Sequence, residues 1–366
     1  MISIEEKNTL LVEFLESKGY ISFSINGFKI INRYSDLDAE MDSLYNGVSL
    51  RNISHLGLIE LKGKDALDLV HRIGTNSIND LPKEGVRNTI FTSEKGRIIG
   101  LSTMLNFEDY QILVTSRANK LKVTSWLKKY IITNDVEVND ANTKYNLLEL
   151  SGPQADSFAT LICGKVVSDI KANSFKIIQT ENLLFFLARL TSERKFDKFW
   201  FLADFDNTRK LINYIQENKV IFNFNLVGEQ AYESYRIEQG IPEAPNELND
   251  QYNPHEAGLT EWIDFNKGCY IGQEVIARLQ TYDKVQKKLT GVKFMEPVEP
   301  GTQFILYDKS GAEVGIITST NHSLRLNEPI GLAYIRNSYL TNGNLLTAKS
   351  DTDSVDVEIH SLPFTK

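Results

Sequence analysis

The chain has 366 residues, 42% of them hydrophobic and 24% charged, a composition typical of a globular protein with about two domains. The 40 Lys and Arg against 48 Asp and Glu give a net charge of −8, which argues against a general nucleic-acid binder. Two cysteines are too few for a disulfide scaffold, and no apolar run approaches the ~18 residues of a membrane span, so we expect a cytoplasmic protein that does not contact membranes.

In chain order, the first 130 residues predict a mixture of helices and strands. Apolar residues at helical spacing predict a helix around residues 10–15, and a short amphipathic helix is expected at residues 65–70. A further helix is predicted at residues 116–130, where basic residues occur without an intervening acid. We interpret them as a solvated helix face, with an acidic partner or RNA as the weaker alternative. Strand-like runs lie at residues 20–25, 49–60 and 89–107.

Beyond residue 145 the pattern divides into two regions. Apolar runs separated by helical patterns predict an α+β lobe, and these runs lie at residues 145–150, 183–190 and 199–202. After residue 284, short runs separated by turn signals predict a small β-barrel or jelly roll, with strands at residues 290–294, 303–307, 313–318, 330–335, 344–348 and 355–359. We therefore expect an α+β region at residues 1–284 and a C-terminal barrel at residues 285–366.

The common cofactor and metal motifs are absent from the sequence. It contains no G-x-x-x-x-G-K-[ST] phosphate loop, no dinucleotide-binding G-x-G-x-x-G and no G-x-S-x-G nucleophile elbow. The five histidines never occur at metal-ligand spacing, and Cys163 and Cys269 lie far apart in the sequence. We therefore predict no metal site.

One short segment carries a chemical signal: Lys267-Gly268-Cys269-Tyr270-Ile271-Gly272-Gln273-Glu274. We predict a strand at residues 261–265 before it and a helix from Gly272 or Gln273 after it, in which Glu274 and Arg278 have the favourable acid-first spacing. Cys269 would lie just before a helix N-terminus and two residues from Lys267, and both neighbours favour a thiolate. A cysteine that is simply buried in the core is the alternative.

Residues 267–274 resemble, position for position, the K-G-C-[FY]-x-G-Q-E signature of the YgfZ family of folate-binding proteins, which are relatives of the glycine-cleavage T-protein (aminomethyltransferase). Further similarities lie at residues 148–153 (Leu-Glu-Leu-Ser-Gly-Pro), 235–240 (Tyr-Arg-Ile-Glu-Gln-Gly), 253–259, 314–319 and 330–333. The resemblance implies two interleaved α/β lobes and a C-terminal β-barrel around a central opening that holds tetrahydrofolate. It also implies transient contacts with iron–sulfur client or assembly proteins.

The helix predicted at residues 228–239 offers a carboxylate to the ligand. Ala231, Tyr235 and Glu238 share one helix face, and a carboxylate can accept two adjacent N–H groups of a pterin ring. The resemblance implies that Glu238 recognises the pterin, with an ion pair to a base such as Arg236 as the alternative. Arg236 and Lys267 are candidates for the anionic tail of folate. The other expected folate contacts are Tyr235, Gly268, Tyr270, Gly272, Gln273, Glu274 and Arg278.

The sequence departs from the T-proteins where those transferases carry a catalytic acid. The matching strand, Gly96-Arg97-Ile98-Ile99, is followed by Gly100 and Leu101, which cannot take or hold a proton. We therefore favour a folate-binding protein of YgfZ type that supports iron–sulfur clusters, with a link to tRNA modification implied by the resemblance. In it Cys269 would supply a reactive thiolate whose pKa Lys267 tunes. The alternatives are a tetrahydrofolate-dependent aminomethyltransferase that uses another acid, and an interaction module without a ligand.

Overall fold

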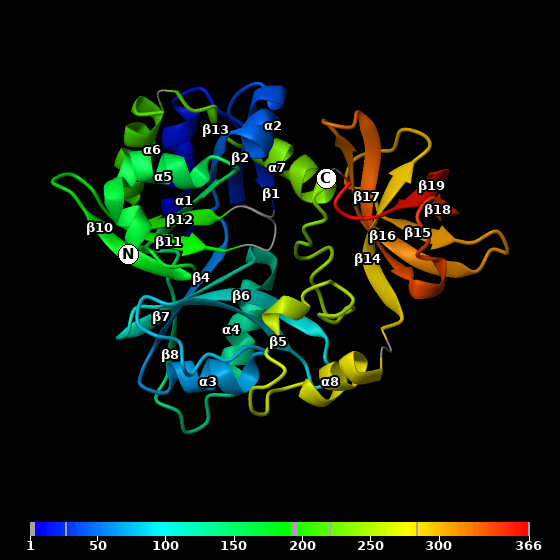
Figure 1. Cartoon of the computed structure of the whole chain (residues 1–366), viewed down its shortest axis with the longest axis horizontal. Helices are drawn as coiled ribbons and strands as arrows, with labels where there is room; N and C mark the ends of the chain where they lie inside the picture. Colours follow the sequence, from blue (N-terminus) through cyan, green and yellow to red (C-terminus); the bar gives the residue numbers. More distant parts are fainter. Residues whose placement is uncertain (1–3, 26–27, 192–196, 220, 283–284, 365–366) are drawn as a thin grey trace.

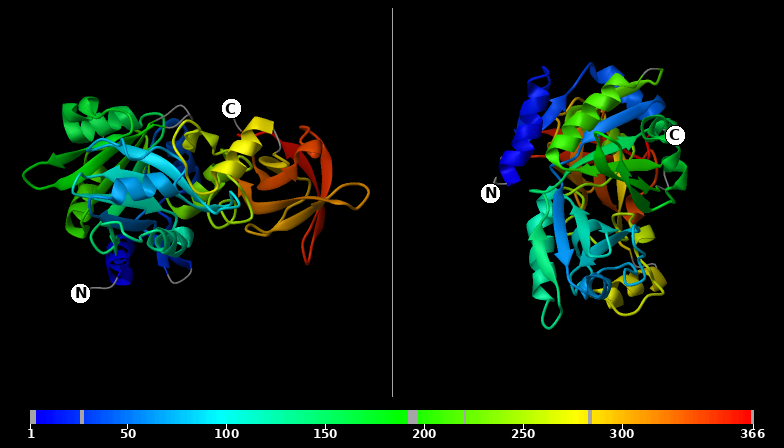
Figure 2. Two further views of the ribbon diagram at one scale, coloured as in Figure 1. Left: turned by 90° about the horizontal axis from the view of Figure 1, so that it is seen from below. Right: turned by 90° about the vertical axis from the view of Figure 1, so that its left-hand side faces the viewer.

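The computed structural model describes residues 4–25, 28–191, 197–219, 221–282 and 285–364. It consists of two α/β lobes and a closed C-terminal barrel (Figure 1). The barrel lies at one end of the long axis of the molecule and the two lobes at the other (Figure 2). This arrangement confirms the predicted α+β architecture with a barrel at the C-terminus.

The first lobe is built on a six-stranded sheet with the order β10-β11-β12-β9-β3-β13. Helices α1, α5 and α6 cover its outer face, where side chains from both layers form one buried apolar cluster. The elements of this lobe are α1 (Ile4–Glu16), β1 (Ile21–Ile25), β2 (Phe28–Arg33), α2 (Leu37–Asn46), β3 (Val48–Asn52), β9 (Asn146–Ser151), α5 (Ala155–Cys163), η2 (Gly164–Asp169), β10 (Ser174–Gln179), β11 (Leu184–Leu190), β12 (Lys198–Ala203), α6 (Phe205–Glu217), β13 (Phe224–Leu226) and α7 (Glu229–Glu238).

The second lobe is inserted into the first between β3 and β9, so the two lobes interleave. Its antiparallel sheet has the order β5-β6-β7-β4-β8, and helices α3 and α4 pack on its outer face. The predicted basic helix corresponds to η1 and α4, and its Lys120 is buried in an ion pair with Asp140 rather than solvated. The elements are β4 (Gly57–Lys62), α3 (Ala66–Ile73), β5 (Val86–Thr92), β6 (Ile98–Asn106), β7 (Tyr110–Thr115), η1 (Arg117–Asn119), α4 (Lys120–Lys129) and β8 (Glu137–Asp140).

The inner faces of the two sheets pack against each other. A buried cluster joins Leu58, Leu105 and Ile112 of the second sheet to Leu147 and Leu202 of the first. Successive side chains of a strand point to opposite faces, so each sheet has one face toward its helices and one toward the other sheet. Polar residues on these inner faces therefore lie between the lobes, away from the helices.

All six strands predicted after residue 284 are present and close into a barrel of order β14-β17-β16-β15-β18-β19. The barrel interior is a separate apolar core, and the first barrel strand begins at Lys287. Residue 284, where we end the α+β region, lies outside the described residues, and the boundary stays a prediction. The elements are β14 (Lys287–Phe294), β15 (Phe304–Tyr307), β16 (Glu313–Ser323), β17 (Glu328–Arg336), η4 (Asn337–Tyr339), β18 (Leu345–Lys349) and β19 (Ser354–His360).

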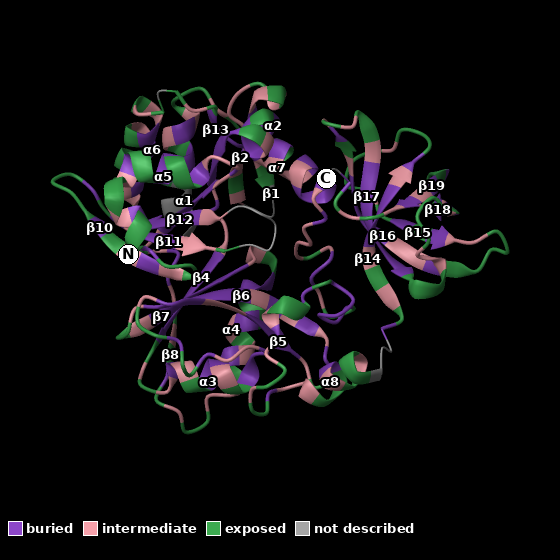
Figure 3. Ribbon diagram, in the orientation of Figure 1, coloured by how far each residue is buried: buried purple, intermediate pink, exposed green. Residues whose placement is uncertain are grey.

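The segment between α7 and β14 connects all three parts. Residues 252–257 are buried although they form no helix or strand (Figure 3), and Tyr252 stacks on Tyr334 of the barrel at 3.6 Å between ring centroids. Further on, η3 (Thr260–Trp262) and α8 (Gln273–Tyr282) follow. Helix α8 starts where the sequence predicts it.

The strand predicted at residues 261–265 is wrong, because this segment forms η3 and a turn instead. Its backbone is held by single contacts to Thr75 rather than by a strand ladder. The hydroxyl of Thr75 donates to the carbonyl of Trp262 at 2.8 Å, and the amide of Asp264 donates to the carbonyl of Thr75 at 3.0 Å. The short pattern Glu-Trp-Ile-Asp-Phe does not distinguish a strand from such a docked turn.

Candidate functional site

A cavity of about 250 Å³ lies between the two lobes. The first lobe contributes Glu149, Lys198 and Trp200 to its wall, and the second contributes Leu101 and Thr103. The end of α7 and the segment behind it close the remaining side. The residues that complete the lining are Asn88, Ser151, Gly152, Asn173, Leu190, Thr191, Tyr235, Ile241, Pro242, Leu259, Glu261 and Trp262. The cavity therefore depends on the interleaving of the lobes, since neither sheet encloses it alone.

A row of three side chains crosses the sheet of the first lobe at this cavity. Arg51 on β3 and Trp200 on β12 are the cross-strand partners of Glu149 on β9. The indole N–H of Trp200 donates to Glu149 Oε2 at 3.1 Å, and the ammonium of Lys198 donates to the same oxygen at 3.3 Å. Arg51 lies on the other side, with Nη1 3.6 Å from Glu149 Oε1. A buried carboxylate is thus surrounded by three donor groups.

These neighbours keep Glu149 ionised. Burial works to raise its pKa, but the positive charges of Lys198 and Arg51 and the Trp200 hydrogen bond outweigh burial and lower the pKa below its usual range. Glu149 therefore presents a fixed negative charge to the cavity at neutral pH.

A larger cavity of about 900 Å³ adjoins the first. The two share lining residues, namely Asn88, Asn173, Thr191, Glu261 and Trp262. Basic residues are numerous in its wall, and they are Lys83, Arg87, Lys171 and Lys176. Three of these four pair with acidic side chains in the structure. A ligand in the central cavity can therefore extend into a neighbouring space with basic side chains.

The position of the expected catalytic acid is occupied by an apolar side chain. Leu101 lines the cavity, whereas a side chain at Gly100 would point the other way, since its Cβ would come within 2.5 Å of Val123 Cγ2. The sequence predicts that the catalytic carboxylate is missing at this position. In the folded protein the apolar side chain of Leu101 lines the cavity there instead.

Glu238 does not line either of these two cavities. It is fully buried at the end of α7, and its carboxylate accepts hydrogen bonds from the hydroxyls of Ser234 (3.0 Å), Ser323 (2.7 Å) and Tyr45. These contacts join α7 to the barrel, and the expected pterin recognition by Glu238 stays a prediction. The alternative, an ion pair with Arg236, is not made, because Arg236 is turned toward other carboxylates.

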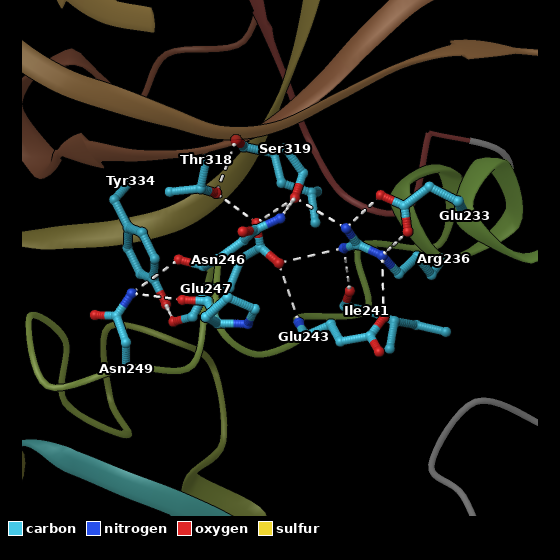
Figure 4. Close-up of polar contacts among 12 residues, drawn as sticks. Glu233, Arg236, Ile241, Glu243, Asn246, Glu247, Asn249, Thr318, Ser319 and Tyr334 are labelled. Carbon is cyan, nitrogen blue, oxygen red and sulfur yellow. Dashed lines mark hydrogen bonds and ion pairs between the residues drawn. The ribbon is translucent and has the colours of Figure 1, made fainter. Parts of the chain in front are cut away.

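Arg236 is the centre of a buried network between α7 and the barrel (Figure 4). Its guanidinium pairs with Glu233, with Glu243 at 3.3 Å and with Glu247 at 3.2 Å, and Nη2 also donates to the hydroxyl of Ser319 at 2.9 Å. Only 2% of the residue is exposed, so the protein itself encloses its side chain, and the expected contact with the tail of folate stays a prediction. Oxygens of Glu229, Glu233 and Glu243 lie within 4.8 Å of one another, but the cation that Glu233 and Glu243 pair with is this guanidinium.

Lys267 is also held by the protein itself. Its ammonium donates to the carbonyls of Gly74 (2.7 Å), Asn76 (3.1 Å) and His71, which uses all three of its N–H groups. Burial lowers the pKa of Lys267 to about 8. An influence on Cys269 would therefore act through charge and not through a hydrogen bond.

The rest of the 267–278 segment lies outside the central cavity. Cys269 is exposed in the turn that leads into α8, so the alternative of a cysteine buried in the core is wrong. Gly272 has a φ of +84°, and a Cβ there would come within 2.5 Å of the Ser93 carbonyl, which explains the glycine. The hydroxyl of Tyr270 is buried without a hydrogen-bond partner. Glu274 and Arg278 are exposed, and Gly268 and Gln273 complete the turn and the first helical position. Of the expected folate contacts, only Tyr235 lines the cavity.

Sequence reasoning missed the main polar group of the cavity, Glu149. A signal was present, because Glu149 is a charged residue within the apolar run Leu147-Leu148-Glu149-Leu150. On a strand with one face against a helical layer, the charged position must face the other way. Lys198 and Trp200 lie on the neighbouring strand, on the same face of the sheet as Glu149. No local sequence pattern indicates that these two strands are neighbours.

The interleaved lobes, the closed barrel and the polar cavity between the lobes define a class of fold, and comparison with known proteins identifies the family. A model of the GCVT N-terminal domain matches residues 11–267, and a model of the glycine cleavage T-protein C-terminal barrel domain matches residues 287–366. The chain therefore belongs to the glycine cleavage T-protein family.

The similar proteins support this assignment. A chloroplastic protein of Arabidopsis thaliana, provisionally named a transferase, is 26% identical over 95% of this chain and 79% of its own length. The aminomethyltransferase of Oceanobacillus iheyensis is 27% identical over 99% of both chains. The crystal structure of aminomethyltransferase T from Bartonella henselae shares the fold with a TM-score of 0.82 and 20% identity, over 97% of each chain. These similarities concern the T-protein family, and membership of the YgfZ branch stays a prediction. Within the described residues, no helix is both long and apolar enough to cross a membrane.

Proposed function

We propose that this protein binds tetrahydrofolate in the central cavity and acts in the manner of the folate-dependent aminomethyltransferases. The cavity between the lobes is the observation that supports this most, since both interleaved lobes and the segment behind α7 form its walls. The chain also corresponds to aminomethyltransferases over nearly its whole length. Bound tetrahydrofolate would supply the nitrogen atoms that accept a one-carbon group. The protein would bind and orient it and shield it from water.

The lining fits such a ligand. Trp200, Tyr235 and Trp262 offer flat apolar surfaces for the ring system, and Glu149 is a buried anion for its N–H donors. The neighbouring cavity with Lys171 and Lys176 offers space for the negatively charged glutamate tail. In this proposal the ring lies between the lobes and the tail extends into the neighbouring cavity.

Calorimetric titration with tetrahydrofolate tests the proposal. We expect saturable heat, and little heat with p-aminobenzoylglutamate, which has the tail but no pterin ring. A mixture of tetrahydrofolate and an aminomethylated lipoyl carrier protein is expected to release ammonia slowly, because Leu101 cannot act as an acid or base. An absence of heat at millimolar tetrahydrofolate would contradict the proposal.

A second candidate, the support of iron–sulfur enzymes in the manner of the YgfZ family, is favoured by two features. Leu101 lines the cavity where the resemblance implies an acid in the transferases. Cys269 is exposed in the turn that leads into α8, within a segment that resembles the YgfZ signature. An exposed cysteine is accessible to a partner protein. In this candidate the fold binds folate and the thiol acts on a client or assembly protein.

Replacement of Cys269 by alanine tests the second candidate in a deletion strain of the host. We expect Cys269→Ala to lose most of the rescue of iron–sulfur enzyme activity while folate binding is kept. Cys163→Ala is the matched control, because burial raises the pKa of that thiol to about 12 and keeps it unreactive at neutral pH. Full rescue by Cys269→Ala would reject a role of the thiol in this process.

A further inference from the structure

We propose that Glu229, Glu233 and Glu243 hold one proton in common at neutral pH, and that the loss of this proton as the pH rises weakens the junction between α7 and the segment 239–247 that follows it. The same junction contributes Tyr235 to the wall of the central cavity, so the protein has a pH-sensitive element beside its candidate site. This proton would be present with or without a bound ligand.

The three carboxylates meet in one place. Oxygens of Glu229, Glu233 and Glu243 lie within 4.8 Å of one another, and the first two residues are four apart on α7, a spacing at which like charges repel. Carboxylates at such distances share a proton more easily than they all ionise. The side chain of Glu243 is 34% exposed, so this proton can exchange with the solvent.

The cations around these carboxylates are too few to neutralise them. Five carboxylates and three basic side chains form one network, and they are Glu149, Glu229, Glu233, Glu243 and Glu247 with Arg51, Lys198 and Arg236. If all were ionised, two negative charges would be in excess. His55 and Tyr232 also face the network, but burial lowers the pKa of His55 and raises that of Tyr232, so neither adds a charge near pH 7. A proton on one carboxylate reduces the excess.

Glu243 is the carboxylate that holds this proton for most of the time. Arg236 donates to Glu233 through two of its nitrogens, whereas it meets Glu243 through a single contact of 3.3 Å (Figure 4). Burial raises the pKa of Glu243 to about 7, because Arg236 only partly offsets it and the negative charges of Glu229 and Glu233 add to it. The pKa of Glu233 is also raised, mainly by burial.

Such a proton makes the stability of the fold decrease as the pH rises. The usual pKa of a glutamate is 4.5, so between this pH and about 7 the folded protein keeps a proton that the unfolded chain releases. The stabilisation is complete below this interval, falls through it, and is absent above the pKa of the folded state. The junction is therefore weaker on the alkaline side of neutrality.

Urea denaturation at a series of pH values tests the proposal with Glu243→Gln, which has the shape of a protonated carboxyl group but cannot ionise. We expect the folding equilibrium constant of wild-type protein, relative to that of the variant, to fall by about tenfold between about pH 5 and pH 8, since solvent access reduces the full effect. EDTA in all buffers prevents a metal ion from taking the place of the proton. A ratio that does not change with pH would overturn the proposal.

Glu84→Gln is the matched control, because Glu84 has a similar exposed fraction of 31% and pairs with one cation, Lys176. Its ratio to wild-type protein should stay constant above about pH 6. Carbon-13 NMR of labelled glutamate carboxyl groups gives a second measurement that needs no stable variant. We expect one resonance of wild-type protein to titrate near pH 7 and to be missing in Glu243→Gln. If no glutamate of wild-type protein titrates above about pH 6, the three carboxylates share no proton and the proposal is wrong.

Discussion

Replacing Arg236 by leucine is expected to lower the free energy of unfolding by about 3–5 kcal/mol, the usual cost of removing one partner from a buried ion pair. The guanidinium is 2% exposed and neutralises Glu233, Glu243 and Glu247, of which Glu247 is fully buried. Burial raises the pKa of Glu233 even in the presence of Arg236. Without the arginine, these carboxylates would remain together in a buried site with no cation between them.

The loss should be concentrated at the junction between α7 and the barrel. Glu247 also accepts hydrogen bonds from Thr318 and Ser319 of β16, and Arg236 donates to Ser319 (Figure 4). We therefore expect amide hydrogen exchange to increase first in α7 and β16, since local opening follows the weakest interface. Arg236→Lys should recover only part of the stability, because an ammonium cannot make the same forked contacts.

Chemical denaturation monitored by circular dichroism gives the measurement, with Arg209→Leu as the matched control. Arg209 also lies on a helix and pairs with an acid three residues away, but its side chain is 47% exposed. That variant should change the stability by less than about 0.5 kcal/mol, as is usual for an exposed pair. A loss below about 1 kcal/mol in Arg236→Leu would show that the network is not a source of stability.

The barrel and the helices of this chain could be predicted from sequence because their signals are local. The six barrel strands are short runs separated by turn residues. Helix α7 ends at Glu238, two residues before Gly240, whose φ of +66° fits a helix stop. The strand expected at residues 261–265 failed because its conformation is set by contacts with Thr75, almost two hundred positions earlier in the chain.

The site was harder to predict because its residues come from distant strands. Glu238 carried a helix-face signal, but the same face also packs on the barrel, and the hydroxyls of Tyr45 and Ser323 that saturate it are invisible to periodicity. Glu149 acquires its role from Arg51 and Trp200, which are neighbours only through strand order. The local sequence pattern thus identifies a charged residue on a strand. The order of the strands in the sheet decides which charged residue lines the cavity.

Replacing Leu101 by aspartate is expected to raise the rate of ammonia release from an aminomethylated carrier by about 10²-fold or more, the usual contribution of one positioned acid or base. Leu101 lines the cavity, and its backbone is fixed by a hydrogen bond of 2.8 Å from Thr115 Oγ1 to its carbonyl. A carboxylate at this position would therefore face the ligand from the second lobe, opposite Glu149 of the first. Gly100 does not offer the same opportunity, because its Cβ would meet Val123.

Leu101→Asn is the matched control, since it adds polarity of the same size without a titratable group. We expect the aspartate variant alone to gain activity, with a rate that falls as pH decreases through the pKa of the new carboxylate, while the affinity for 5-formyltetrahydrofolate stays similar in both variants. A gain in Leu101→Asp would show that the fold retains the other parts of a transferase and lacks only this group. If both variants bind folate and neither gains turnover, the missing acid is not the limiting feature. The proposal of aminomethyl transfer would then lose its support. The second candidate, in which the protein binds folate and Cys269 acts on iron–sulfur proteins, would become the stronger proposal.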